Sequence, residues 1–171
     1  QEARNKWKGS GTLDLTWQLV GHLQRNKVGS ALELFSLIQS VDSLRLAQAI
    51  DKEAERRGKA AEVLIQINAS GETSKHGFPV VGGLESVSEI SGLANLRVVG
   101  LMAMAPLTLD ESVLCNTFRR TRALFELCHG KVDGFEPRHL SLGMTSDYEV
   151  AVEEGSTMVR LGTALFGERR S

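Results

Sequence analysis

Short, almost continuously apolar runs recur along the chain, and longer helical patterns separate them. Six runs have the length of a strand and are rich in β-branched and large aliphatic residues: 17–21, 36–41, 63–68, 96–102, 139–143 and 158–162. Apolar side chains at consecutive positions are typical of parallel strands that are covered by helices. The pattern therefore predicts an α/β protein with six parallel strands.

Helical spacing of apolar residues predicts helices over 44–57 and 112–128, and the polar segment 1–7 is also predicted to be helical. Side-chain oxygens stand where two helices should begin, and glycines stand where two should end; these residues are Asp42, Ser43, Ser146, Asp147, Gly58 and Gly130. We expect the former to cap free amides and the latter to end their helices.

The chain is expected to form one domain over residues 1–171, because it contains no low-complexity linker and no shift in composition. Six strand and helix units are fewer than the eight of a closed barrel. Two architectures therefore stay open at this point. One is part of a (β/α)8 barrel, and the other is an open, doubly wound sheet of six strands.

Charge and composition limit the function classes. The chain has 20 basic and 21 acidic residues and a net charge of −1, so it has no bulk field for nucleic acid or an anionic membrane. No apolar stretch approaches the roughly 20 residues of a membrane span, and we expect a cytoplasmic protein. Cys115 and Cys128 lack CxxC spacing, and the histidines are not clustered in the sequence. We therefore expect reduced thiols and no metal site.

Two turns after the last two strands are candidates for binding a phosphate. Residues 141–143 (SLG) and 162–164 (GTA) are mostly small, so that backbone amides and hydroxyls can converge there on an anion. In eight-stranded barrels the loops after the last two strands commonly bind phosphate. The alternative is that the glycines only permit tight turns. Neither turn matches the GxGxxG or GxxxxGK[ST] pattern, so nucleotides are not indicated.

Arg160 lies inside an apolar strand, between Val159 and Leu161. A buried guanidinium is costly unless it has a fixed acceptor, which favours a role facing a ligand. A structural ion pair stays the alternative.

Two polar loops follow other strands. Segment 66–78 places Asn68 at a strand end and Lys75 close behind it, and it is either a ligand edge or a solvated loop. Segment 20–27 contains His22, Asn26 and Lys27, where a lone histidine is commonly a structural group.

Five motifs stand in the order found in pyridoxal 5′-phosphate (PLP) homeostasis proteins, the YggS/PROSC family: GHLQRNK, SVDS, QINASGETSKHGF, GLMAMAP and LSLGMTSDYEVAVEEGSTMVRLGTALFGER. The chain resembles this family over nearly all of residues 1–169. The resemblance implies a (β/α)8 TIM barrel of PLP fold type III, similar to the N-terminal domain of alanine racemase, with about six of its eight units in this sequence. It also implies a protein that binds and delivers PLP without established catalysis.

The resemblance assigns a role to each candidate ligand. Ser141, Gly162 and Thr163 resemble the phosphate ligands, and Gly143 and Met144 line the same turn. Arg160 resembles the arginine that faces the pyridine nitrogen, where a cation keeps that nitrogen unprotonated and so weakens the ring as an electron sink.

Further positions are implied on the cofactor side of the barrel. Asn68 and Met102 resemble strand-end residues that face the cofactor, and His22, Asn26 and Lys75 lie at the rim. No catalytic residue and no metal ligand is implied.

The family's Schiff-base lysine lies in a segment resembling VAVSKT on the first strand, followed by a GENY-like motif. Neither motif occurs in these 171 residues. The resemblance implies that both belong to units that precede Gln1. Lys27 and Lys75 belong to other motifs and are not expected to replace that lysine.

The alternative function is that of a racemase-like PLP enzyme. Racemases with this barrel use an appended β-domain and a tyrosine, whereas the single tyrosine here, Tyr148, lies within a motif of the carrier family. A phosphosugar enzyme would need paired acid and base residues at strand ends, which the sequence does not suggest. The expected partners are PLP and PLP-dependent apoenzymes, and we expect a monomer.

Overall fold

The computed structural model describes residues 15–72 and 75–167. In chain order the elements are β1 (Gln18–Leu19), η1 (Arg25–Lys27), α2 (Val28–Leu34), β2 (Leu37–Val41), α3 (Leu44–Arg56), β3 (Ala61–Asn68), β4 (Phe78–Pro79), α4 (Gly83–Ser91), β5 (Leu96–Ala103), α5 (Glu111–Lys131), β6 (Phe135–Met144), α6 (Tyr148–Glu153), β7 (Met158–Arg160) and α7 (Thr163–Phe166). The helix predicted over 1–7 lies outside the described residues. All six predicted strands are confirmed.

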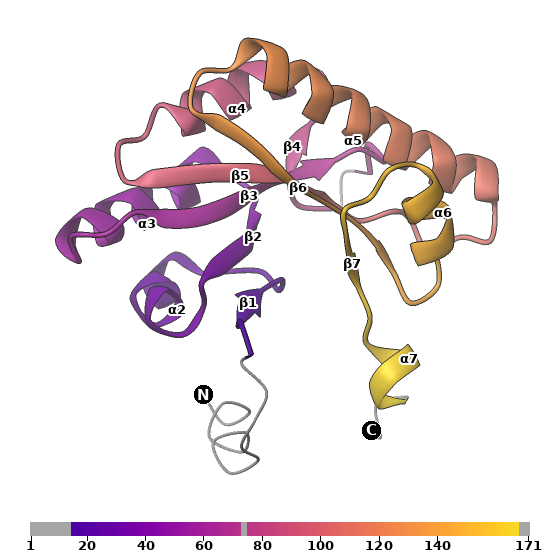
Figure 1. Ribbon diagram of the computed structural model, residues 1–171, viewed down its shortest axis with the longest axis horizontal. Helices are drawn as coiled ribbons and strands as arrows, with labels where there is room; N and C mark the ends of the chain where they lie inside the picture. The colour runs from indigo at the N-terminus through magenta and orange to yellow at the C-terminus, as the bar shows by residue number, and fades with distance from the viewer. Residues whose placement is uncertain (1–14, 73–74, 168–171) are drawn as a thin grey trace.

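The strands form one parallel sheet in the order β1-β2-β3-β5-β6-β7, and the short β4 pairs with β3 beside this path. Along this path each strand lies beside the one before it, without the reversal of order that defines a doubly wound sheet. The sheet is arched, and α3, α4 and α5 cover its convex side (Figure 1). The barrel-type prediction is therefore confirmed for this part of the chain, and the doubly wound alternative is wrong.

The main core lies between the convex face of the sheet and the helices. Its largest fully buried side chains include Ile50 of α3, Ile90 of α4, Phe118 of α5 and Leu101 of β5. Each such side chain contributes roughly 1.5–3 kcal/mol through the hydrophobic effect. The helical spacing seen in the sequence thus marks the face that packs on the sheet.

A second, smaller cluster consists of Leu37, Leu64, Val99 and Met102, with Met104 and Met158 packed against it. Successive residues of a strand point to opposite faces, so a sheet buried on both faces needs apolar side chains at consecutive positions. This second cluster explains why the strands read as continuous apolar runs.

The helix ends differ from the predicted caps. Ser43 and Asp147 precede α3 and α6 without a side-chain capping bond. The Asp42 carboxylate lies beside His22, and that of Asp147 accepts the Met144 amide, so nearby groups in the loops use these oxygens instead. Gly58, with φ of 63°, follows α3 as predicted.

The prediction for the end of α5 was slightly wrong. The helix runs through Gly130 and ends at Lys131. None of the helices in the described part of the chain is long and apolar enough to cross a membrane.

Candidate functional site

An open pocket of about 1060 Å³ lies where the strands end at their carboxyl termini. It is lined by Glu72, Lys75, His76, Met104, Ala105, Pro106, Leu107, Met144, Thr145, Ser146, Asp147, Gly162, Thr163, Phe166 and Gly167. These residues follow β3, β5, β6 and β7, whose carboxyl ends share one edge because the strands are parallel. Ligands of barrel proteins bind at this edge.

The turn predicted at 162–164 lies in the wall of this pocket. The turn predicted at 141–143 is wrong, because these residues lie inside β6, and the turn that reaches the pocket is the next one, at 145–147. The Gly162 amide donates to the hydroxyl of Thr145 over 3.2 Å, which joins the turn after β7 to the turn after β6. Among the described residues, none accepts a hydrogen bond from the amides of Thr163 or Ala164. The turn therefore offers free amide donors beside a pocket, as an anion requires.

Gly143 has a steric role at the carboxyl end of β6. Its φ is 86°, a conformation that L side chains rarely adopt. A Cβ here would lie 2.6 Å from the Cβ of Ala151 and 2.9 Å from the Cα of Tyr148. Glycine thus allows α6 to pack directly on the end of β6, and this places Met144 in the pocket wall.

The half-buried Arg160 and the buried Ser141 form a polar pair next to the pocket. Arg160 Nη1 donates to the carbonyl and the hydroxyl oxygen of Ser141, at 2.8 and 2.7 Å, and Nη2 donates to the Ala103 carbonyl at 2.9 Å. Its buried Nε finds no acceptor among the described residues. Burial lowers the pKa of Arg160 to about 10, and the negative charge of Asp147 partly opposes this.

Ser141 is fully buried, and its hydroxyl donates to the side chain of Gln39 over 2.7 Å. The Gln39 amide in turn donates to Gln18 over 2.6 Å. This chain of hydrogen bonds crosses the inner side of the arch, from β7 through β6 and β2 to β1. Ser141 thus fixes Arg160 and does not line the pocket.

Both polar atoms of the Asn68 side chain form hydrogen bonds within the loop after β3. Its amide nitrogen donates to the carbonyls of Glu72 (2.8 Å) and Lys75 (3.2 Å), and its oxygen accepts from Ser70 and Gly71. Lys75 Nζ then lies 3.0 Å from the Ala105 carbonyl and 3.3 Å from Glu72 Oε1. Asn68 therefore holds the part of the loop that lines the pocket.

The predicted ligands separate into three groups. Met144, Gly162 and Thr163 line the pocket, as does the rim residue Lys75. Ser141 and Arg160 form the adjoining polar pair, whereas Gly143, Asn68 and Met102 support the framework; Met102 is fully buried in the small inner cluster. The rim residues His22 and Asn26 line a separate depression.

Sequence reasoning missed Thr145, whose hydroxyl joins the two turns. The signal was a hydroxyl residue one position after Met144, in the motif already chosen as phosphate-binding. It also missed Phe166, which is exposed and lines the pocket, because nothing in an apolar helical position distinguishes a pocket wall from a core.

A parallel, barrel-type sheet with these turns at its carboxyl edge defines the class of alanine racemase N-terminal-like barrels. Residues 8–170 match the family model of the alanine racemase N-terminal domain. The chain belongs to the family of pyridoxal phosphate homeostasis proteins. It is 38% identical to the protein of that name from Aquifex aeolicus over 170 residues, which are 99% of this chain and 74% of the relative. It is 37% identical to the Homo sapiens protein over 163 residues, covering 91% of this chain and 59% of the relative.

Solved structures agree with this assignment. PipY of Synechococcus elongatus, whose structure contains bound PLP, aligns with a TM-score of 0.83 at 32% identity over 96% of this chain and 76% of its own. An alanine racemase of Clostridium difficile aligns with a TM-score of 0.77 at 17% identity, over 100% of this chain and 44% of its own. The latter likeness shows the fold alone.

Proposed function

We propose that this chain binds PLP in the pocket at the carboxyl edge of the sheet and serves intracellular PLP homeostasis as a carrier. The observation that carries the proposal is the pair of free amide donors at Thr163 and Ala164, next to a pocket and a half-buried arginine. The names of the relatives and the PLP in the PipY structure support it. The pocket volume of about 1060 Å³ is sufficient for a ligand of this size.

The phosphate is proposed to lie at the joined turns. Gly162 and Thr163 line the pocket, and the bond from Gly162 to Thr145 holds the backbone so that the Thr163 amide keeps its direction. A preorganised donor costs little conformational entropy when the anion binds. Ser141, which we first expected to contact phosphate, is proposed to act indirectly, by fixing Arg160.

Arg160 is proposed to face the pyridine nitrogen. PLP supplies an aldehyde and an electron-withdrawing ring when it is bound. Nη1 and Nη2 of Arg160 already donate to Ser141 and Ala103, which fixes the guanidinium and leaves Nε and one N–H of Nη2 as the remaining donors. A fixed cation disfavours protonation of the pyridine nitrogen, which suits a carrier better than a racemase.

The absence of catalysis is part of the proposal. The Tyr148 hydroxyl donates to the neighbouring Glu149 over 3.1 Å and does not line the pocket. Lys75 is held by the Ala105 carbonyl and Glu72, and the Asp147 carboxylate accepts the Met144 amide. Lys75, Glu72 and Asp147 are thus engaged in shaping the wall of the pocket. We further propose that the protein is a cytoplasmic monomer and that it delivers PLP to apoenzymes.

Binding measurements with and without the phosphate group test it. Calorimetric titration should give PLP an affinity at least tenfold higher than that of pyridoxal, which lacks the phosphate. Thr145→Val removes the acceptor of the Gly162 amide, a hydrogen bond of about 1 kcal/mol, so PLP should bind about fivefold more weakly while pyridoxal is unaffected. Thr16→Val, on an exposed threonine, is the matched control. Equal affinities for PLP and pyridoxal would contradict the proposal.

A further inference from the structure

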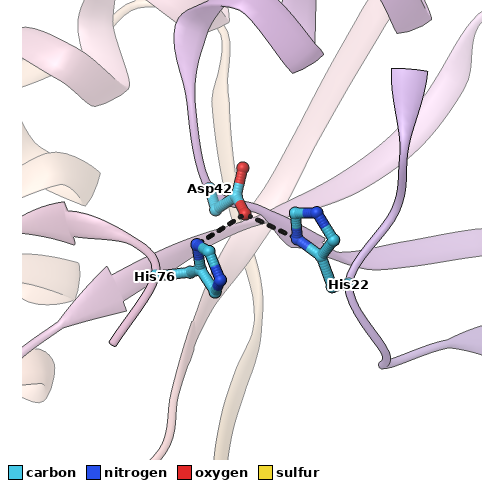
Figure 2. A group of neighbouring side chains, drawn as sticks. All are labelled: His22, Asp42 and His76. Carbon is cyan, nitrogen blue, oxygen red and sulfur yellow. Dashed lines mark hydrogen bonds and ion pairs between the residues drawn. The ribbon is translucent and has the colours of Figure 1, made fainter. Parts of the chain in front are cut away.

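Three side chains that are far apart in the sequence meet at the carboxyl edge of the sheet: His22, Asp42 and His76 (Figure 2). His22 follows β1, Asp42 directly follows β2, and His76 precedes β4. The parallel strands bring these loops to one edge. The spacing of residues carries no metal signal because the two histidines are 54 positions apart.

The two imidazoles converge on one carboxylate oxygen. Nδ1 of His22 lies 3.1 Å from Asp42 Oδ2, and Nδ1 of His76 lies 3.8 Å from the same oxygen. The rings stack with their centroids 4.8 Å apart and their planes at 24°. The potential ligand atoms of all three residues lie within 4.8 Å of one another.

The charge of Asp42 is compensated only in part. Its side chain is 8% exposed, and within the described residues its polar partners are these two imidazoles. A nearly buried carboxylate is costly unless a cation or a set of hydrogen bonds accompanies it. One divalent cation shared by the three ligands would compensate this carboxylate.

We infer that His22, Asp42 and His76 bind a divalent transition-metal ion of the zinc class. Two imidazole nitrogens and one carboxylate oxygen are ligands that Zn²⁺ takes in proteins, with water completing the tetrahedron in open sites. Metal–ligand bonds of about 2.0–2.1 Å keep tetrahedral ligand atoms about 3.3–3.4 Å apart. The two distances to Asp42 Oδ2 lie on either side of this value. To enclose an ion, the side chain of His76 must rotate so that its Nδ1 approaches Asp42 Oδ2.

The site is open to water on the side of the histidines, whose side chains are 52% and 68% exposed. An ion can enter there without any change in the backbone. His76 also lines the proposed PLP pocket, whereas His22 and Asp42 line the neighbouring depression. The metal site thus lies at the edge of the pocket and shares one side chain with it. It uses none of the residues proposed to bind PLP.

Titration of the untagged, PLP-free chain with Zn²⁺, in competition with a chromophoric chelator, tests the inference. We expect one ion per chain, and a loss of at least tenfold in affinity for each of His22→Gln, Asp42→Asn and His76→Gln. His129→Gln is the matched control, since His129 is an exposed histidine on α5. The His129→Gln variant should bind Zn²⁺ as tightly as the unchanged chain. Omitting PLP keeps the result independent of the proposed function.

Substitution with Co²⁺ reports the ligands directly. A four-coordinate site gives intense visible d–d bands, and these should disappear in both histidine variants. Both imidazoles are exposed, so these variants should retain the circular dichroism spectrum of the unchanged chain even if Asp42→Asn does not. The inference is wrong if the three variants bind Zn²⁺ as tightly as the unchanged chain, or if His129→Gln lowers the affinity as much as they do.

Discussion

Replacing Arg160 by Ala separates its proposed role in binding from its role in packing. The change removes three hydrogen bonds from a charged donor, two to Ser141 and one to Ala103. At about 2 kcal/mol each this amounts to about 6 kcal/mol. Burial lowers the pKa of Arg160 to about 10 from 12.5, which corresponds to a cost of about 3 kcal/mol for the charged form that the variant no longer bears. We therefore expect a net loss of about 3 kcal/mol in the free energy of unfolding.

Affinity must be compared at equal stability. Ile90→Ala removes a fully buried side chain between α4 and the convex face, at a cost of about 2–5 kcal/mol, and touches nothing in the pocket. Both variants should show similar denaturant midpoints. PLP affinity, measured by calorimetry where both are folded, should fall at least tenfold in Arg160→Ala and stay unchanged in Ile90→Ala. Equal PLP affinities in the two variants would refute the role of Arg160 in binding and leave it a structural arginine.

Two further predictions concern stability. Gly143→Ala should lower the free energy of unfolding by about 2 kcal/mol or more because its φ is 86° and the added methyl group overlaps α6, whereas Gly21→Ala, with nothing within 4 Å, should have little effect in the same thermal unfolding experiment. Hydrogen bonds from Arg56 and Arg57 lower the pKa of Glu53 from 4.5 to about 2, so the stability it contributes is fully present above pH 4.5 and is lost as the pH falls towards 2. Glu53→Gln should remove this part of the acid dependence of the unfolding temperature, and an unchanged pH profile would contradict the assignment.

The strands were predictable because the arch buries both faces of the sheet. Residues such as Leu64 and Ile65 point to opposite sides, yet both are fully buried, one in the inner cluster and one under the helices. Burial of both faces requires apolar residues at consecutive positions, and this pattern is visible in the sequence. β4 was missed because two residues, Phe78 and Pro79, carry no periodicity.

The side-chain partners within the site were less predictable. The turn at Gly162 was predicted from its small residues, whereas the other turn was predicted a few residues too early, at 141–143, which belong to β6. The partner of Ser141 is Gln39, 102 positions away on β2, and only the curvature of the sheet brings them together. Whether a hydroxyl at a strand end faces the pocket or the interior depends on such distant contacts. The contact between His22 and His76 could not be predicted either, because it depends on how their two loops pack at one edge of the sheet.

The most direct test of the account is the position of PLP in a structure of this chain crystallised with it. We expect the phosphate to lie within hydrogen-bonding distance of the Thr163 amide, at the turn joined by Gly162 and Thr145, and the pyridine nitrogen to face Arg160. A phosphate bound away from this turn, or a ring that does not approach Arg160, would contradict it.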